Sequence, residues 1–140
     1  MAMKKSTWVL LTVLVFGVAI GFGLHVAIGQ QTAPTQFKGI KPGKAWTLDL
    51  GPQIEEMRGW RWGARVFTME PGAHSPVHSH KDRPGMGYVI QGVLTEQRDG
   101  KTNQYHAGDI WVEDKDTTHW IENNGTEPVS CLAIDITKTP

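Results

Sequence analysis

Turn signals recur so often between residues 45 and 140 that the chain has no room for a long helix. Glycine, proline, asparagine and aspartate gather at Pro71-Gly72, Gly92, Asp99-Gly100, Ala107-Gly108-Asp109 and Asn123-Asn124-Gly125. The segments between them are short and rich in β-branched and aromatic residues, as strands are. We therefore predict an all-β domain, either a sandwich or a barrel.

The expected strands follow from the positions of these turns. They cover residues 46–50, 59–69, 86–98 with a break at Gly92, 102–106, 110–113, 118–122 and 128–137. Asp99-Gly100 is the two-residue signal of a tight hairpin, so the strands that flank it should pair. One helical turn is expected, over residues 53–58.

The N-terminal residues differ in composition from the rest. Lys4 and Lys5 precede a nearly unbroken apolar run from Trp8 to Leu24, which carries no acidic or basic residue. A basic start followed by an apolar run is typical of a signal peptide, and the small residues of 27–29 suit its cleavage. The same run is a candidate membrane anchor, because about 20 apolar residues span a bilayer.

Both alternatives place the rest of the chain outside the cytoplasm, because lysines beside such a run stay on the cytoplasmic side. The domain is therefore expected to be periplasmic or secreted, or held at a membrane through the N-terminal segment alone. We predict three parts. Residues 1–29 form a hydrophobic helix that is a signal peptide or anchor, residues 30–44 a polar linker with two prolines, and residues 45–140 the folded domain.

Composition excludes some functions. The 14 lysines and arginines balance 14 acidic residues and form no basic stripe, so a nucleic-acid partner is not expected. The single cysteine, Cys131, excludes an internal disulfide and a thiolate-rich zinc site. The six histidines remain as candidates for chemistry.

Three of these histidines lie between residues 74 and 80. On a strand, residues i and i+2 face the same side, so His78 and His80 should project together. Two neutral imidazoles on one face can bind a single metal ion. Two exposed polar residues on a surface strand would give the same pattern, so a third ligand is needed. His119, on a later strand, is the candidate.

The spacing around the first pair resembles the first motif of the cupin superfamily. That motif is a glycine, five residues, HxH, a short gap, a glutamate, six residues and a glycine. Here five residues separate Gly72 from His78-Ser79-His80, and Gly92 is the glycine that ends the motif. The glutamate belongs near position 85, where this chain has Gly85.

The second motif of the family also has its counterpart. Gly108-Asp109 is followed by His119 and, four residues later, by Asn123, whereas Asp116-Thr117-Thr118 replaces the usual proline and glycine. The resemblance covers about residues 65–137. It implies a double-stranded β-helix, or jelly-roll cupin barrel, that holds a divalent metal through His78, His80 and His119. Fe²⁺, Zn²⁺, Mn²⁺, Ni²⁺ and Cu²⁺ all suit such ligands.

The missing glutamate has two interpretations. No acidic residue lies between Asp82 and Glu96. Three histidines without a carboxylate resemble the ferrous sites of cupin-type thiol dioxygenases and diketone-cleaving dioxygenases. Alternatively, the site binds metal weakly or merely holds a small ligand.

The strand that begins near Gly85 should carry alternating inward and outward residues. If Gly85 faces inward, Gly87 leaves space beside the metal, and Val89 and Gln91 also point in. Gln91 is then either a polar contact inside the barrel or a rim residue.

Two functions remain open from the sequence. One is a metal-dependent dioxygenase, isomerase or lyase that acts on a small organic acid or diketone. The other is a non-catalytic module that binds a small molecule. A base near the metal would favour the enzyme, and the candidates are His74, Asp82, Tyr88 and Glu96. His74 is the candidate catalytic residue, although a loop histidine is often simply solvated.

Two further residues suggest partners. Trp120 neighbours His119 and should face away from the metal, so it is a candidate contact in a homodimer, which cupins often form through their outer sheets. Three other tryptophans of the domain, Trp60, Trp62 and Trp111, are expected in the core. Arg83 either attracts the carboxylate of a small-molecule ligand or belongs to an exposed, solvated turn.

Overall fold

The computed structural model describes residues 32–139. The expected hydrophobic helix of residues 1–29 lies outside this range. Within the range, the structure contains no helix with the length and apolar character needed to cross a membrane.

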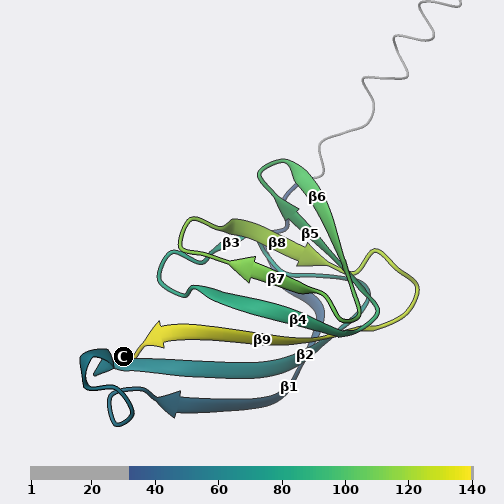
Figure 1. Cartoon of the computed structure of the whole chain (residues 1–140). Coiled ribbons are helices and arrows are strands. Elements are labelled where there is room, and N and C mark those ends of the chain that lie inside the picture. The colour runs from purple at the N-terminus through teal and green to yellow at the C-terminus, as the bar shows by residue number, and fades with distance from the viewer. Residues whose placement is uncertain (1–31, 140) are drawn as a thin grey trace, which may run out of the picture. The chain divides into compact units, whose positions relative to one another are not determined.

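Antiparallel strands make up most of residues 32–139 (Figure 1). In chain order the elements are β1 (Lys38–Asp49), η1 (Glu55–Met57), β2 (Trp60–His74), β3 (His78–Ser79), β4 (Gly85–Gln91), β5 (Val93–Arg98), β6 (Lys101–His106), β7 (Ile110–Glu113), β8 (Thr118–Glu122) and β9 (Val129–Lys138). The strand order is β6-β5-β8-β2-β9-β4-β7, with β1 added to β2 and β3 to β8. The sheet curls into a nearly closed jelly-roll barrel, which confirms the all-β prediction.

Turn chemistry sets two of the strand boundaries as expected. Asp99 and Gly100 have φ angles of 52° and 70°, the left-handed conformation that a tight hairpin requires. Arg98 pairs with Lys101 across this turn. Gly92, with a φ angle of 85°, separates β4 from β5. A glycine adopts this conformation without steric cost, and the strand therefore breaks where the sequence indicates.

Two expected boundaries are wrong. Residues 38–44, assigned above to the linker, begin β1 and pair with β2. β1 accommodates Gly39 and Pro42 because its pairing is irregular at two places, between 38 and 40 and between 42 and 45. Proline is tolerated at such irregularities on a strand. β2 also continues through Pro71-Gly72 to His74 instead of ending there.

The core fills the inside of the barrel. Its most buried apolar side chains are Met69, Val89, Leu94, Trp111, Val129 and Cys131. Trp111 is buried as expected, but Trp62 is 48% exposed, so the expectation of core burial is wrong for Trp62. Val89 points inward as expected, whereas Gln91 is exposed. A register shift between Val89 and Gln91 interrupts the alternation and turns Gln91 outward.

Candidate functional site

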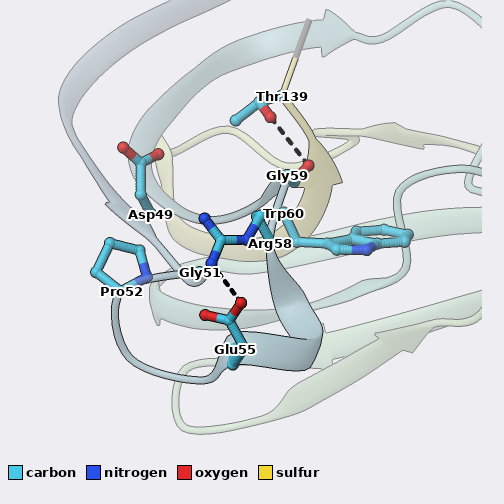
Figure 2. A pocket seen from close by; sticks show the side chains of 8 residues that line it. All are labelled: Asp49, Gly51, Pro52, Glu55, Arg58, Gly59, Trp60 and Thr139. Carbon is cyan, nitrogen blue, oxygen red and sulfur yellow. Dashed lines mark hydrogen bonds and ion pairs between the residues drawn. The ribbon is translucent and has the colours of Figure 1, made fainter.

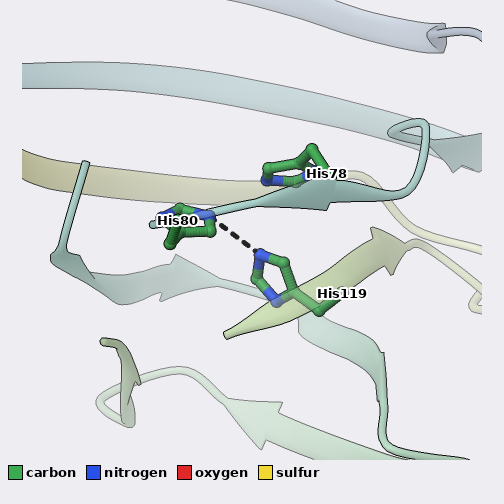
Figure 3. Close-up of side chains that lie close together, drawn as sticks. All are labelled: His78, His80 and His119. Atoms are coloured by element: carbon green, nitrogen blue, oxygen red, sulfur yellow. Dashed lines mark hydrogen bonds between the residues drawn. The ribbon is translucent and has the colours of Figure 1, made fainter. Parts of the chain in front are cut away.

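Strand pairing brings the three motif histidines together, as expected. His78 on β3 is the register partner of His119 on β8, and His80 follows β3 with its ring on the same side (Figure 3). One ring nitrogen from each histidine lies within 4.8 Å of those of the other two, and the ring centroids are 4.7 to 5.0 Å apart. His80 and His119 are buried, whereas His78 is half-buried. His78 is therefore the member of the cluster that solvent reaches.

Each ring is oriented by an acceptor at Nδ1. The pairs are His78 with the Pro76 carbonyl oxygen at 3.0 Å, His80 with the Arg83 carbonyl oxygen at 3.0 Å, and His119 with Glu96 Oε1 at 2.6 Å. Because carbonyl and carboxylate oxygens only accept, each Nδ1 carries the proton and each Nε2 keeps its lone pair. Two of these, Nε2 of His80 and Nε2 of His119, lie 3.1 Å apart. Oriented imidazoles with free lone pairs are what a metal site requires.

Electrostatics favour the neutral form of two of these rings. Burial lowers the pKa of His78, and the nearby His119, His80 and Arg83 lower it further, against a raising hydrogen bond to the Pro76 carbonyl. Burial is also the main cause that lowers the pKa of His80. Both rings are therefore neutral at pH 7, the state in which imidazole coordinates a metal.

Glu96 orients His119, and both of its carboxylate oxygens accept hydrogen bonds. Its Oε1 accepts hydrogen bonds from His119 at 2.6 Å and from Arg98 at 2.6 and 3.0 Å, and its Oε2 from Asn103 and Tyr105 at 3.1 and 3.0 Å. Burial alone would raise the pKa of Glu96, but hydrogen bonds from His119, Arg98 and Tyr105 outweigh it and hold the pKa at about 2. Glu96, a candidate base in the sequence, is therefore a charged acceptor at pH 7 that orients His119.

The other candidate bases lie away from the cluster. His74 is the register partner of Glu122, which alternates with Ile121 and so faces away from the side of β8 that bears His119. Tyr88 is 41% exposed on the outer face of β4, and Asp82 is exposed in the turn after His80. A catalytic role for His74 stays a prediction that this placement does not favour.

Position 85 has no room for the carboxylate that the family motif provides. A Cβ on Gly85 would lie 2.4 Å from the backbone oxygen of Ile134. The register partner of Gly85 on β7 is Glu113, whose buried carboxylate lies 3.4 Å from His80 Nδ1 and 3.5 Å from His119 Nε2. Sequence reasoning missed Glu113. The available signal was alternation, since Trp111 and Glu113 share one face of a short strand.

Asn123 of the second motif stabilises the turn between β8 and β9. Its side-chain nitrogen donates to the carbonyl oxygens of Met69 at 3.0 Å and Glu127 at 2.9 Å, and its oxygen accepts from the Gly125 amide at 3.0 Å. The bonds with Glu127 and Gly125 close the turn between β8 and β9, and the bond to Met69 holds this turn against β2. The spacing of four residues after His119 places Asn123 at the start of this turn.

A cavity of about 420 Å³ lies apart from the histidines, where β1, η1 and the start of β2 meet (Figure 2). Its lining residues are Asp49, Gly51, Pro52, Glu55, Arg58, Gly59, Trp60 and Thr139. Arg58 is paired with Glu55, and the Thr139 hydroxyl donates to the Gly59 carbonyl oxygen. These polar groups satisfy one another, so we assign no ligand to this cavity.

Two curated proteins resemble the chain over part of its length. The oxalate decarboxylase OxdC of Bacillus subtilis is 32% identical over 74 residues, which are 49% of this chain and 19% of that protein. The oxalate-binding protein of Thermotoga maritima is 30% identical over 76 residues, which are 52% of this chain and 63% of that protein. The match thus spans less than two thirds of either relative.

Solved structures and a family comparison extend this likeness to the fold. The crystal structure of a predicted oxalate decarboxylase from Thermotoga maritima aligns with a TM-score of 0.53 and 21% identity, over 79% of this chain and 98% of that one. The family described as "Cupin domain" matches residues 65–135, a range that includes all three histidines of the cluster. The motif spacing, the barrel and this match agree, and the chain belongs to the cupin domain family.

Proposed function

We propose that His78, His80 and His119 hold a divalent metal ion and that the protein binds a small chelating carboxylate there. One observation carries this proposal: every Nδ1 of the cluster is hydrogen-bonded, and the ring nitrogens converge to within 4.8 Å. Neutral imidazole suits Fe²⁺, Zn²⁺, Ni²⁺ and Cu²⁺, whereas Mn²⁺ prefers oxygen ligands, and experiment has to choose among these ions.

The charge around the cluster supports an anionic ligand. Three neutral imidazoles contribute no negative charge to the metal. The guanidinium of Arg83 is close enough to lower the pKa of both His78 and His80, although it also lies 3.5 Å from Asp135. The names of both curated relatives concern oxalate, a small dianion that can offer two oxygens to one metal. Oxalate is therefore the first ligand to test.

We favour binding over catalysis as the function of this site. Of the acids and bases suggested by the sequence, Glu96 is ion-paired with Arg98, and His74, Tyr88 and Asp82 lie away from the cluster. A general base must lie within hydrogen-bonding reach of the group that it deprotonates. A dioxygenase, isomerase or lyase acting on a small organic acid or diketone is the alternative, and product analysis distinguishes the two.

Calorimetry on metal-loaded and metal-free protein tests the proposal. Oxalate should bind only after loading with Mn²⁺ or Zn²⁺, and His119→Ala should weaken metal binding by at least about 100-fold, since even supporting residues cost about 10- to 100-fold. His106→Ala is the matched control, because His106 is an exposed histidine on β6 outside the cluster. Equal metal binding by both variants, or oxalate binding without metal, would refute the proposal. Release of a product from oxalate would establish the catalytic alternative.

We also propose that the domain works outside the cytoplasm. The support is the order of the N-terminal sequence, in which Lys4 and Lys5 precede the apolar run Trp8 to Leu24. Fractionation of cells that express the full chain, with mass spectrometry of its N-terminus, tests this. A full-length protein in the cytoplasmic fraction would contradict it.

A second copy of the chain is the partner that we propose for the outer side of the barrel. We define the outer apolar face by eight large side chains that are 41–58% exposed: Trp46, Leu48, Trp62, Met86, Tyr88, Ile90, Ile110 and Val112. They lie on β1, β2, β4 and β7, which join through β9 into one sheet. Trp120, the contact expected from the sequence, is only partly exposed on β8.

The composition and size of this face support such a contact. Met86 pairs with Ile134 and Val112, and Tyr88 pairs with Leu132 and Ile110, so neither row carries a charge. If a fully exposed large side chain presents about 150–250 Å², the eight together expose roughly 800 Å². One partner of a standard interface contributes about that area.

Sedimentation of the wild type and of Met86→Lys tests the dimer. The wild type should sediment as a dimer, and a lysine in the middle of the face should give monomers with an unchanged circular dichroism spectrum. Thr102→Lys, on exposed β6, is the control and should stay dimeric. A monomeric wild type at micromolar concentration would rule the contact out.

A further inference from the structure

Gly85 lies between two buried carboxylates that belong to neighbouring strands. It pairs with Glu113 on β7 and with Asp135 on β9, so all three residues face the inside of the barrel. A side chain at position 85 would collide with the backbone of β9. No side chain can therefore extend from position 85, and a carboxylate beside the histidines has to come from a neighbouring strand.

The two carboxylates differ in their partners. Asp135 is neutralised by Arg65 at 2.6 Å and approached by Arg83 at 3.5 Å. Within residues 32–139, Glu113 has no lysine or arginine in an ion pair, and the titratable groups beside it are the imidazoles of His80 and His119. A buried carboxylate without a cation is costly. A divalent ion at the histidines would supply the missing positive charge.

The distance from Glu113 to His119 suits a carboxylate that shares a metal with that ring. Glu113 Oε1 lies 3.5 Å from Nε2 of His119, which itself lies 3.1 Å from Nε2 of His80. Two ligand atoms bound to one ion at about 2.1 Å are separated by about 3.0 to 3.4 Å in octahedral or tetrahedral sites. Glu113 Oε1 therefore stands about as far from His119 as a neighbouring ligand would.

Trp111 holds the Glu113 carboxylate in this position. The Trp111 indole Nε1 donates a 2.7 Å hydrogen bond to Glu113 Oε1, and Trp111 is 2% exposed. The Trp111 ring lies against Gly87, where a Cβ would come within 1.9 Å of it. Gly87 leaves space for the Trp111 ring, and Trp111 in turn orients Glu113. Gly85 allows the backbone of β9 to come close to β4. Both glycines therefore contribute to the position of the Glu113 carboxylate.

We propose that Glu113 is the carboxylate of the metal site and replaces, from the neighbouring strand, the glutamate that the family motif has near position 85. This inference rests on the proposed metal-binding function. It makes the site one of three histidines and one carboxylate, so the bound ion keeps one net positive charge. It also leaves fewer positions for an incoming anion than three histidines alone would.

Glu113→Gln tests this, because glutamine keeps the shape and the acceptor for Trp111 while it removes the charge. Metal affinity, measured by calorimetry with Co²⁺, should fall about 10- to 100-fold. The visible absorption of the Co²⁺ protein should change, because it reports the ligands of the ion. Azide, used as an anionic probe of the loaded protein, should bind at least about tenfold more tightly, because the ion keeps its full charge. Asp135→Asn is the matched control, with an equally buried carboxylate paired to Arg65.

The outcomes separate this inference from the function on which it rests. If the wild type binds no Co²⁺, the metal-binding proposal fails and the assignment of Glu113 fails with it. If the wild type binds Co²⁺ and Glu113→Gln matches it in metal affinity, spectrum and azide affinity, only the assignment of Glu113 is wrong. Weaker metal binding with an unchanged spectrum and azide affinity also overturns it, because that result describes a supporting residue. Should Glu113→Gln fail to fold, Glu113→Asp keeps the charge but shortens its reach, and unaltered Co²⁺ absorption in that variant would overturn the assignment.

Discussion

Replacing Glu96 with glutamine measures how much one buried charge stabilises this barrel. The pKa of Glu96 falls from the ordinary 4.5 to about 2, because the hydrogen bonds from His119, Arg98 and Tyr105 outweigh the effect of burial. A displacement of that size corresponds to about 3 kcal/mol of folding free energy. Solvent does not screen this contribution, since the Glu96 side chain is fully buried. We therefore expect Glu96→Gln to lower the free energy of unfolding at pH 7 by about 3 kcal/mol.

The same charge should make stability fall in acid. The pKa in the folded state lies below the unfolded value, so the contribution is complete above about pH 4.5 and is lost as the pH falls toward 2. About 2 kcal/mol of it should be gone at pH 3. Glu96→Gln has no such group, so its unfolding free energy should approach that of the wild type as the pH is lowered.

Urea unfolding of metal-free protein at pH 7 and pH 3, followed by circular dichroism, provides the measurement. Glu127→Gln is the control, because Glu127 is exposed and contributes only its backbone oxygen to Asn123. A loss below about 1 kcal/mol at pH 7, or the same loss at both pH values, would show that the charge of Glu96 does not stabilise the fold.

Three further experiments probe the interior. Gly87→Ala should cost at least about 1–3 kcal/mol in urea unfolding, because the added methyl collides with the buried Trp111 ring; an unchanged midpoint would contradict this contact. Asn123→Ala should cost about 1–3 kcal/mol, because it leaves the carbonyl group of the buried Met69 without the Asn123 donor, and thermal unfolding checks the loss. Burial raises the pKa of Cys131 to about 12, so the folded protein should not react with a thiol reagent at pH 8 and the urea-unfolded protein should react fully; fast labelling of folded protein would show that this strand opens.

The local parts of the fold could be predicted from the sequence. Strand ends at Gly92 and at Asp99-Gly100 depend on backbone conformations that glycine and aspartate adopt readily, so neighbouring residues are sufficient to set them. The pair His78 and His80 shares a face because alternation on a strand is also local. Alternation alone could not predict the third ligand, His119. That prediction came from the spacing that resembles the cupin motif.

Tertiary structure decided what lies across from each residue. The linker prediction was wrong for residues 38–44 because polar sequence with proline can still pair with a long neighbour such as β2. Gln91 was expected to face inward, but a register shift that depends on β9 turned it outward.

The same reason explains why sequence reasoning found Gly85 but not Glu113. The sequence showed that position 85 lacks a carboxylate, because that statement concerns one residue and its motif. Only the register between β4 and β7 places Glu113 opposite Gly85, with its carboxylate beside His80 and His119. Register is set by hydrogen bonds between strands that are distant in the chain, and a one-residue slip would send Glu113 to the outer face. The histidines could therefore be named from the sequence, whereas the charge that surrounds them was decided by the folded sheet.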